Sequence, residues 1–528
     1  MNILIMASEN DGIKGGKVGG LGDVIRDVPP ALAARGHMVH VVTPSYGFLH
    51  RINDSRQTGT VGFMFSGRFH EADLYEVQGK NHHSHIRLSV IEHPVFASQD
   101  NRGDHSFYSF DPPDRPFASD ATKFALFCMA IAKAVTDGVF GRLDCIHLHD
   151  WHMGFFLILR AFHPEMKGLQ QIRSVFSIHN LALQGIRPFR NSDSSLEAWY
   201  PGLGYNPDLL SDPRWRNCVN PMASAIRLAD AVHTVSPAYA DEILHPSRQP
   251  MFYGGEGLEA DLVQARDKHR LSGILNGCAY PESHQPARMK WQALLKLLSN
   301  AVIQWCGKSH TVPAAHFIAC ERLKQLERLS QKPDMVMTTV SRVVEQKLYL
   351  MKAPGSVQMT GQMSGLDQLL RDIEGHGVYL FLGAGDPEYE WFLTQMSSRY
   401  RHFVFLNGYS EDCAQALYAN GDLFVMPSSF EPCGISQMLA MRDGQPCLVH
   451  NVGGLKDTVQ HGYNGFVFNG NTVIEMVDDF IRTGREAAEI KLNAPDKWKK
   501  ICRQASDCRF LWDDSIGQYV KGLYEGKG

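Results

Sequence analysis

The sequence predicts an α/β protein with two parallel-sheet domains, and three observations support this prediction. The chain has 528 residues, which is too long for one hydrophobic core and suits two domains. Short apolar runs repeatedly end in glycine-rich or polar turns that precede amphipathic helices. The apolar runs Asn2–Met6 and Gly36–Pro44 flank a helix predicted from about Val24 to Arg35, which gives a strand–helix–strand opening.

Composition and charge exclude several classes of function. Lys and Arg number 52 against 56 Asp and Glu, and the formal net charge of −4 argues against a general nucleic-acid binder. No apolar run reaches the roughly 18 residues of a membrane helix, so we expect no membrane partner. The opening Met1–Asn10 lacks a basic segment, and we expect a first strand there, not a signal peptide. Eleven cysteines without a CxxC pair favour a reducing cytoplasm over a disulfide framework or zinc ribbon.

The first predicted strand leads into a glycine-rich loop, SENDGIKGGKVGGLGD. This loop lacks the Ser or Thr of a Walker motif and the spacing of GxGxxG, so alone it predicts only a strand-to-helix connection. However, Gly19 and Gly20 would let the backbone approach a diphosphate, and Lys17 would supply positive charge.

Two further predicted strands end in polar clusters. The segment LDCIHLHDWH contains His147, His149, Asp150 and His152, and the segment SVFSI is followed by His179. The three histidines lack the i, i+4 spacing of a helical metal site, and hydrogen-bonded core histidines are the common alternative. We therefore expect no metal.

The same pattern recurs over Asp422–Phe468, DLFVMPSSFEPCGISQMLAMRDGQPCLVHNVGGLKDTVQHGYNGFVF. The pattern predicts a strand, a turn with Glu431, Cys433 and Gly434, a helix, a second strand and a Gly-Gly turn. In open α/β sheets such turns lie at the carboxyl ends of strands, where ligands bind. A carboxylate there either caps the helix or hydrogen-bonds ligand hydroxyls while backbone N–H groups hold phosphate.

A strand predicted over Asp334–Val340 is followed by SRVVEQK, with Arg342 and Lys347. Two such cations are ordinarily solvated surface charges. Alternatively, a guanidinium and an ammonium that converge on one diphosphate would bind it and stabilise the charge that builds as it leaves.

Five motifs in order resemble those of bacterial glycogen synthases and plant starch synthases: KVGGLGDV, HLHDWH, SIHNLALQG, VSRVVEQK, and FEPCG followed by GGL. Members of this family are retaining glycosyltransferases of the GT-B fold, with two Rossmann-like domains facing a deep central cleft. The resemblance covers nearly the whole chain except about residues 288–335. It implies an N-terminal starch synthase catalytic domain over 1–280 on the acceptor side, a nucleotide-sugar domain over 288–500, and a C-terminal helix over 505–528 that crosses back to the first domain.

The resemblance implies glucose transfer from ADP-glucose to the non-reducing end of an α-1,4-glucan such as glycogen, with retention and without a metal or other cofactor. Glu431 would hydrogen-bond the 3- and 4-hydroxyls of the glucose, and Asp150 and His179 would contact the same sugar. Arg342 and Lys347 would stabilise the departing ADP. The other donor-site residues implied by the resemblance are Lys17, Gly19, Gly20, Asp23, Asn276, Cys433 and Gly434. Tyr108 stands where the family has an aromatic loop near the sugar.

Two departures from the family pattern leave alternatives open. Ser429 stands where the family usually has Arg, and His450-Asn451-Val452 replaces the usual Arg-Arg-Thr, which removes one or two positive charges near the donor phosphate. The alternatives are a GT-B transferase with another donor or acceptor, a glucan-binding or regulatory homologue without turnover, and a GT-B sugar-nucleotide epimerase. The diphosphate-binding cations argue against the second. The donor base, the acceptor length and the oligomeric state do not follow from the sequence.

Overall fold

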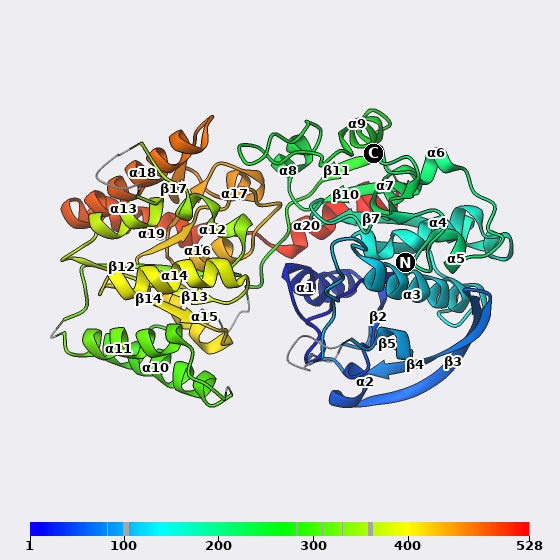
Figure 1. The fold of residues 1–528 in the computed structure, drawn as a ribbon, viewed down its shortest axis with the longest axis horizontal. Coiled ribbons are helices and arrows are strands. Elements are labelled where there is room, and N and C mark those ends of the chain that lie inside the picture. The colour runs from blue at the N-terminus through cyan, green and yellow to red at the C-terminus, as the bar shows by residue number, and fades with distance from the viewer. Residues whose placement is uncertain are drawn as a thin grey trace. The chain divides into compact units, whose positions relative to one another are not determined.

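The computed structural model describes residues 1–81, 83–98, 105–280, 284–308, 310–329, 331–356 and 363–526. Its internal contacts divide the chain into two compact units. Unit 1 comprises Met1–Ser247, Gly254–Gly277 and Trp512–Gly528, and unit 2 comprises Arg248–Tyr253 and Cys278–Leu511. Each unit is built on its own sheet (Figure 1).

Unit 1 contains a nine-stranded sheet with the order β11–β10–β7–β6–β1–β2–β5–β4–β3. All neighbours pair in parallel except β4, which is antiparallel to both β5 and β3. The strands are β1 (Asn2–Met6), β2 (Met38–Pro44), β3 (Ser55–Phe65), β4 (Arg68–Val77), β5 (Ile86–Glu92), β6 (Cys145–His149), β7 (Arg173–Ile178), β10 (Ala231–Thr234) and β11 (Leu271–Gly273). A separate short pair joins β8 (Arg187–Pro188) and β9 (Cys218–Val219).

The central strands of unit 1 form because their residues are apolar on both faces. In β1, Ile3, Leu4, Ile5 and Met6 are all buried, as expected for a parallel strand covered on both sides. The helices of unit 1 are α1 (Gly20–Ala34), α2 (Leu49–Ile52), α3 (Ala118–Thr136), α4 (Gly154–Phe162), α5 (Leu196–Trp199), α6 (Pro207–Leu210), α7 (Pro221–Leu228), α8 (Pro237–Glu242), α9 (Glu259–Asp267) and α20 (Trp512–Gln518). The first helix starts four residues before the predicted Val24, because the extended Gly19 precedes its first turn.

The C-terminal segment Trp512–Tyr524 completes the core of unit 1. Its residues Ile516, Tyr519 and Leu523 are buried in one cluster with Ile3 and Val24. The contacts of α20 with α1 place this helix beside the first helix of the chain.

Unit 2 contains a six-stranded, fully parallel sheet with the order β14–β13–β12–β15–β16–β17. Numbered along the chain, this order is 3-2-1-4-5-6, the doubly wound Rossmann arrangement. The strands are β12 (Met335–Val340), β13 (Gly377–Gly383), β14 (Phe403–Asn407), β15 (Leu423–Met426), β16 (Cys447–His450) and β17 (Gly465–Phe468). The prediction of two Rossmann-like domains is confirmed.

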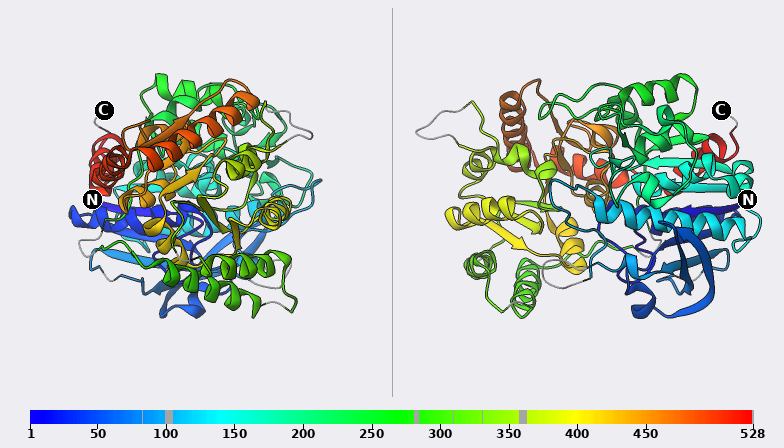
Figure 2. Two further views of the ribbon diagram at one scale, coloured as in Figure 1. Left: turned by 90° about the vertical axis from the view of Figure 1, so that its left-hand side faces the viewer. Right: turned by 45° about the vertical axis from the view of Figure 1, so that its right-hand side comes forward.

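Helices cover both faces of this sheet, as the two views in Figure 2 show. Successive strand residues alternate between two cores: Met337 and Phe381 belong to one, and Val336 and Leu380 to the other. The first core is covered by α12 (Glu345–Lys352), α13 (Gly365–Asp372), α14 (Pro387–Arg399) and α18 (Val473–Asn493). The second is covered by α10 (Trp291–Cys306), α11 (Ala314–Glu327), α15 (Glu411–Asn420) and α16 (Ser436–Arg442), with α17 (Gly453–Thr458) beside them. A last helix, α19 (Pro495–Asp507), contributes to both cores.

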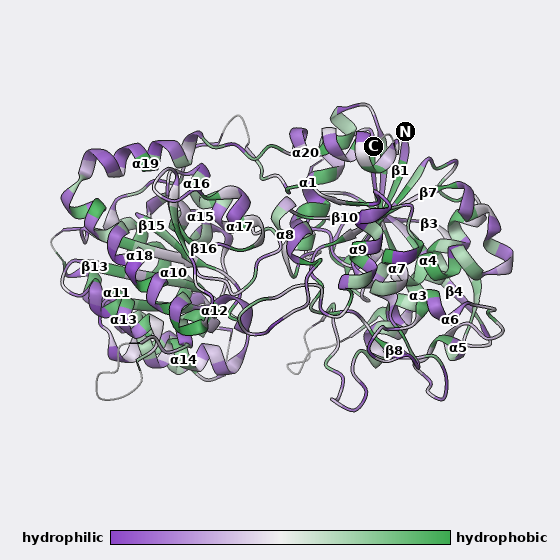
Figure 3. Ribbon diagram, turned by 90° about the horizontal axis from the view of Figure 1, so that it is seen from above, coloured by the Kyte–Doolittle hydropathy of each residue, from purple (hydrophilic) through white to green (hydrophobic). Residues whose placement is uncertain are grey.

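The hydropathy colouring of Figure 3 agrees with this layering, since β15 and β16 are hydrophobic and much of α19 is hydrophilic. Within the described ranges no helix is both long and apolar enough to cross a membrane.

Candidate functional site

The order of strands reverses between β12 and β15 of unit 2, and open parallel sheets bind ligands outside the carboxyl ends of strands at such a point. A small hollow lies there. It is lined by Ser341 and Lys347, which follow β12, and by Pro427 and Ser428, which follow β15. The topology therefore places the predicted SRVVEQK and FEPCG motifs beside one another.

Lys347, from the SRVVEQK motif, and Glu431, from the FEPCG motif, form an ion pair, although they lie 84 residues apart in sequence. The side chains are only 13% and 9% exposed. The paired oxygen, Oε2, also accepts a hydrogen bond from the Ser428 hydroxyl (3.1 Å). Within the described residues no hydrogen bond to the other oxygen, Oε1, is present, so this atom remains available to a ligand.

Arg342 lies exposed just after β12. In the part of the chain that the structure describes, its guanidinium makes neither a hydrogen bond nor an ion pair. A guanidinium without a protein partner is suited to an anionic ligand.

Two glycines fix the turn that carries Glu431. Gly434 has a φ of 77°, which favours glycine. The N–H of Gly454 donates to the carbonyl of Glu431 (3.0 Å), and a Cβ at Gly454 would lie 2.3 Å from the carbonyl oxygen of Cys433. The buried Cys433 and the Gly-Gly turn are thus in direct backbone contact, which explains the need for a residue without a side chain at position 454.

The two family departures are uncharged in this environment. Ser429 donates its N–H (2.9 Å) and its hydroxyl (3.1 Å) to the carbonyl of Gln346. His450 lies buried against the Phe468 ring, at 5.0 Å between centroids, and its Nδ1 lies 3.0 Å from the carbonyl of Ser428. Burial lowers the pKa of His450 to about 4, so the ring is neutral at pH 7. Ser429 and His450 therefore add no positive charge beside the pair of Lys347 and Glu431.

In unit 1 the strand order reverses between β1 and β6. Glu9 follows β1 and Asp150 follows β6, and both are buried. Asp150 has a φ of 59°, a strained backbone conformation of a kind that clusters at functional sites. Its Oδ1 accepts the N–H of His179 (2.7 Å). Burial raises the pKa of Asp150 to about 7, although the N–H groups of His179 and Asn180 oppose this shift.

The predicted histidine cluster is an internal hydrogen-bond network. His179 Nε2 lies 2.8 Å from His149 Nδ1, and burial lowers the pKa of His179 to about 3. His147 uses both ring nitrogens, toward the hydroxyls of Tyr524 (2.9 Å) and Ser177 (2.6 Å). Among the described residues no group of three His, Cys, Asp or Glu side chains is arranged to hold a metal ion.

Glu9 is a site residue that the sequence interpretation missed. Its Oε2 accepts the N–H groups of Val18 (2.8 Å) and Gly19 (2.5 Å), and its Oε1 accepts the Tyr108 hydroxyl (2.8 Å). A carboxylate, not an open anion site, therefore faces the N–H of Gly19. The space beside the Cα of Gly20 is open, since a Cβ built there would meet no atom within 4 Å. The signal that could have identified Glu9 is its position directly after the first strand.

Lys17 and Asp23 are paired with one another at 2.7 Å, and Arg26 also contacts Asp23 at 2.9 Å. Burial raises the pKa of Asp23, and Lys17 opposes this shift. Asn276 is buried after β11, where its N–H donates to the Val235 carbonyl (3.2 Å). Its side-chain oxygen has no hydrogen-bond partner within the described structure.

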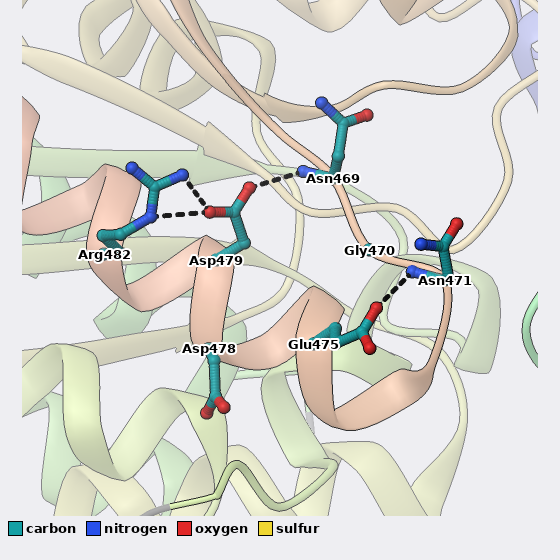
Figure 4. A pocket seen from close by; sticks show the side chains of 7 residues that line it. All are labelled: Asn469, Gly470, Asn471, Glu475, Asp478, Asp479 and Arg482. Carbon is teal, nitrogen blue, oxygen red and sulfur yellow. Dashed lines mark hydrogen bonds and ion pairs between the residues drawn. The ribbon is translucent and has the colours of Figure 1, made fainter.

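A second hollow lies at the start of α18, and none of the predicted site residues lines it (Figure 4). Asp479 accepts the N–H of Asn469 (2.8 Å) and pairs with Arg482, while Glu475 accepts the N–H of Asn471 (2.9 Å). Because Asp479 is paired with Arg482 and Glu475 binds the backbone of the adjoining loop, we assign no ligand to this hollow.

Comparison with known proteins identifies the family. Residues 2–264 match the starch synthase catalytic domain and residues 363–484 match glycosyl transferases group 1. The glycogen synthases of Streptococcus equi subsp. equi (strain 4047) and Gloeobacter violaceus (strain ATCC 29082 / PCC 7421) are 31% and 30% identical, with 98% of each chain covered.

Among solved structures, the catalytic domain of starch synthase IV from Arabidopsis thaliana, bound to ADP and acarbose, matches with a TM-score of 0.74 and 25% identity. The match covers 99% of this chain and 98% of that one. The family predicted from five ordered motifs is confirmed over the full length: the chain belongs to the glycogen synthase and starch synthase family of glycosyltransferases.

Proposed function

We propose that the protein transfers glucose from ADP-glucose to the non-reducing end of an α-1,4-glucan, with retention at the anomeric carbon. The observation that carries this proposal is the Lys347–Glu431 pair at the switch point of unit 2, with Arg342 unpaired nearby. A sugar diphosphate needs hydrogen-bond acceptors for its hydroxyls and cations for its phosphates, and this arrangement offers both. The matched starch synthase IV structure contains ADP and acarbose, a nucleotide and an oligosaccharide analogue, which supports the assignment.

Glu431 accepts hydrogen bonds from hydroxyl groups of the transferred glucose through Oε1, because Oε2 already binds Lys347 and Ser428. The fixed turn around Gly434 presents backbone N–H groups at the same place. For unit 1 by itself, we assign Asp150 and His179 to the binding of sugar hydroxyls. The ring of His179 is neutral, so it takes part in hydrogen bonds and not as a cation.

Arg342 and Lys347 stabilise the negative charge that develops on the departing ADP. The departing phosphate takes the proton of the attacking glucan hydroxyl, so the mechanism assigns no protein nucleophile. Because the two cations neutralise the diphosphate, the proposal includes neither a metal nor another cofactor. Lys17, which is paired with Asp23, contacts the donor as a further cation.

The neutral Ser429 and His450 specifically favour a second candidate, a transferase of the same family with a different nucleotide-sugar donor. Fewer charges near the phosphates leave donor selection more dependent on the base. The choice between ADP-glucose and UDP-glucose is therefore the first point to measure.

The test is incorporation of labelled glucose into glycogen from ADP-glucose and from UDP-glucose in parallel, with EDTA present. We expect incorporation from ADP-glucose, loss of activity in Glu431→Gln, and unchanged activity in Glu321→Gln, whose carboxylate lies in an exposed pair with Lys324. Incorporation from UDP-glucose alone would establish the second candidate. Folded protein that uses neither donor would contradict the ADP-glucose proposal and would favour another donor or a role without turnover. Release of free nucleotide only in the presence of glucan would exclude an epimerase.

A further inference from the structure

A lysine and an aspartate are buried together on helix α3 of unit 1, away from the predicted motifs. The side chains of Lys123 and Asp120 are 2% and 8% exposed and lie one helical turn apart, with Nζ 3.0 Å from Oδ1. Burial lowers the pKa of Lys123 and raises that of Asp120, and the pairing opposes both shifts. Because a buried ion pair is often no more stabilising than apolar residues of the same volume, stability alone does not account for it.

The remaining hydrogen bonds of the pair hold the backbone on both sides of Tyr108. Lys123 Nζ donates to the carbonyl of Phe107 (2.8 Å), and Asp120 Oδ1 accepts the N–H of Ser109 (3.0 Å). The residue before Tyr108 and the residue after it are therefore each fixed by one member of the pair.

The ring and hydroxyl of Tyr108 are held in turn. The ring lies near those of Phe124 (6.5 Å) and His152 (5.5 Å between centroids), and His152 belongs to the HLHDWH motif. The hydroxyl donates to Glu9 Oε1 (2.8 Å) and lies 3.0 Å from the Ser8 hydroxyl.

Glu9 then connects Tyr108 to the glycine-rich loop, because its second oxygen accepts the N–H groups of Val18 and Gly19. A continuous set of hydrogen bonds thus runs from the buried pair through Tyr108 and Glu9 to the start of α1. The members come from four segments of unit 1: helix α3, residues 107–109, the residues after β1 and the loop before α1. Packing of α3 alone would therefore not set the position of the loop.

We propose that Lys123 and Asp120 are positioning residues for glucosyl transfer, which act by fixing Tyr108 and, through it, Glu9 and the Val18–Gly19 backbone. This inference rests on the proposed function for its kinetic consequence only. The positions that it assigns to Tyr108 and the loop can be measured without any substrate.

The test variant is Asp120→Leu/Lys123→Met, because replacing both members of a buried pair by apolar residues keeps the fold where a single replacement would leave an unpaired buried charge. The control is Lys133→Met, which removes an exposed ion pair with Asp137 from the same helix. We expect the double variant to stay folded, with a thermal midpoint lowered only by the loss of the bonds to Phe107 and Ser109. Its kcat should fall about tenfold, as misplacement of site residues does. Lys133→Met should keep the wild-type kcat.

Two further measurements separate positioning from general damage. Tyr108→Phe alone should also lower kcat, and its combination with the double variant should cost little more than either, because the groups act through one another. Amide hydrogen exchange should accelerate in peptides that cover Phe107–Ser109 and Lys17–Gly20 in the double variant, and not in Lys133→Met.

Unchanged exchange in Lys17–Gly20 overturns the proposal, whatever the activity. Unchanged kcat in the double variant, or fully additive losses with Tyr108→Phe, overturns it as well. If the wild-type protein transfers no glucose, the proposed function fails, while the exchange comparison still decides whether the pair positions the loop.

Discussion

Replacing Lys347 with Met should lower both stability and activity, and a second replacement, Glu431→Gln, should restore only the stability. In the single variant the Glu431 carboxylate stays buried with the Ser428 hydroxyl as its side-chain partner. Breaking a buried ion pair costs about 3–5 kcal/mol, and the 13% and 9% exposures of the two side chains place this pair near the lower end. A loss of about 3 kcal/mol corresponds to about 6–12 °C in the thermal midpoint of a unit of this size.

The double variant Lys347→Met/Glu431→Gln removes both charges. Its glutamine keeps an oxygen for the Ser428 hydroxyl, so the remaining destabilisation should be about 1 kcal/mol. Adding Glu431→Gln to Lys347→Met should therefore recover about 2 kcal/mol of the stability that the single variant loses. Activity should behave differently, because the lysine stabilises the leaving group and the carboxylate binds the sugar. Each single variant should lose about 100-fold or more in kcat, and the double variant should recover none of it.

The assay combines a thermal unfolding scan with glucose incorporation from labelled ADP-glucose into glycogen. Lys324→Met, which breaks an exposed pair in the same unit, serves as the control and should change neither quantity. Additive losses of stability would show that the two side chains are not coupled. Recovery of activity in the double variant would refute the assignment of separate chemical roles.

Three other predictions concern single positions. Arg342→Gln should raise the KM for ADP-glucose about tenfold at an unchanged thermal midpoint, since the guanidinium has no partner to lose within the described structure; an unchanged KM would contradict its role. In Gly454→Ala the new Cβ would lie 2.3 Å from the carbonyl oxygen of Cys433, so the turn that carries Glu431 must move. The kcat should fall about tenfold as a result. A wild-type kcat in this variant would contradict the importance of that contact. The pKa of Asp150 is raised to about 7 in the folded protein. Between about pH 4 and pH 7 the folded protein therefore holds a proton that the unfolded chain releases. The stability contribution of this group falls as pH rises through that window. Asp150→Asn should abolish this dependence. The thermal midpoint of the variant minus that of the wild type should therefore rise from pH 5 to pH 8. A difference that does not change with pH would contradict the burial argument.

Several strands of both sheets could be predicted because buried parallel strands are nearly continuous apolar runs. The run Leu423–Met426 is β15, and Cys447–His450 is β16. The polar residues that follow these runs must gather at one edge of the sheet, and the structure pairs Lys347 with Glu431 there. The assignment of Arg342, Lys347 and Glu431 to one site came from the family resemblance. The order of the strands could not be predicted, because nothing local in a strand specifies its neighbours.

The hydrogen-bond partners of the site residues could not be predicted from the sequence either. The glycine-rich loop suggested free N–H groups, but Glu9, the second residue of the same loop, accepts those of Val18 and Gly19. Whether a carboxylate or a ligand occupies such a group depends on the path of the loop and not on its composition. Likewise, the histidine at position 450 could have carried a charge, and only its burial against Phe468 shows that it does not.

The return of Trp512–Tyr524 to the core of unit 1 has a consequence for how the protein is made. The 234 residues of Cys278–Leu511 are synthesised between Gly277 and this segment. At about 5–20 residues per second, the growing chain waits on the order of 10–50 s before Ile516, Tyr519 and Leu523 can cover Ile3 and Val24.

During that interval the nascent first unit exposes an apolar surface, and the Tyr524 hydroxyl has not yet reached His147. Unit 2, in contrast, is almost complete by Leu511. Unit 1 is therefore synthesised first but completes its fold last. Shielding by a chaperone matters most for this unit.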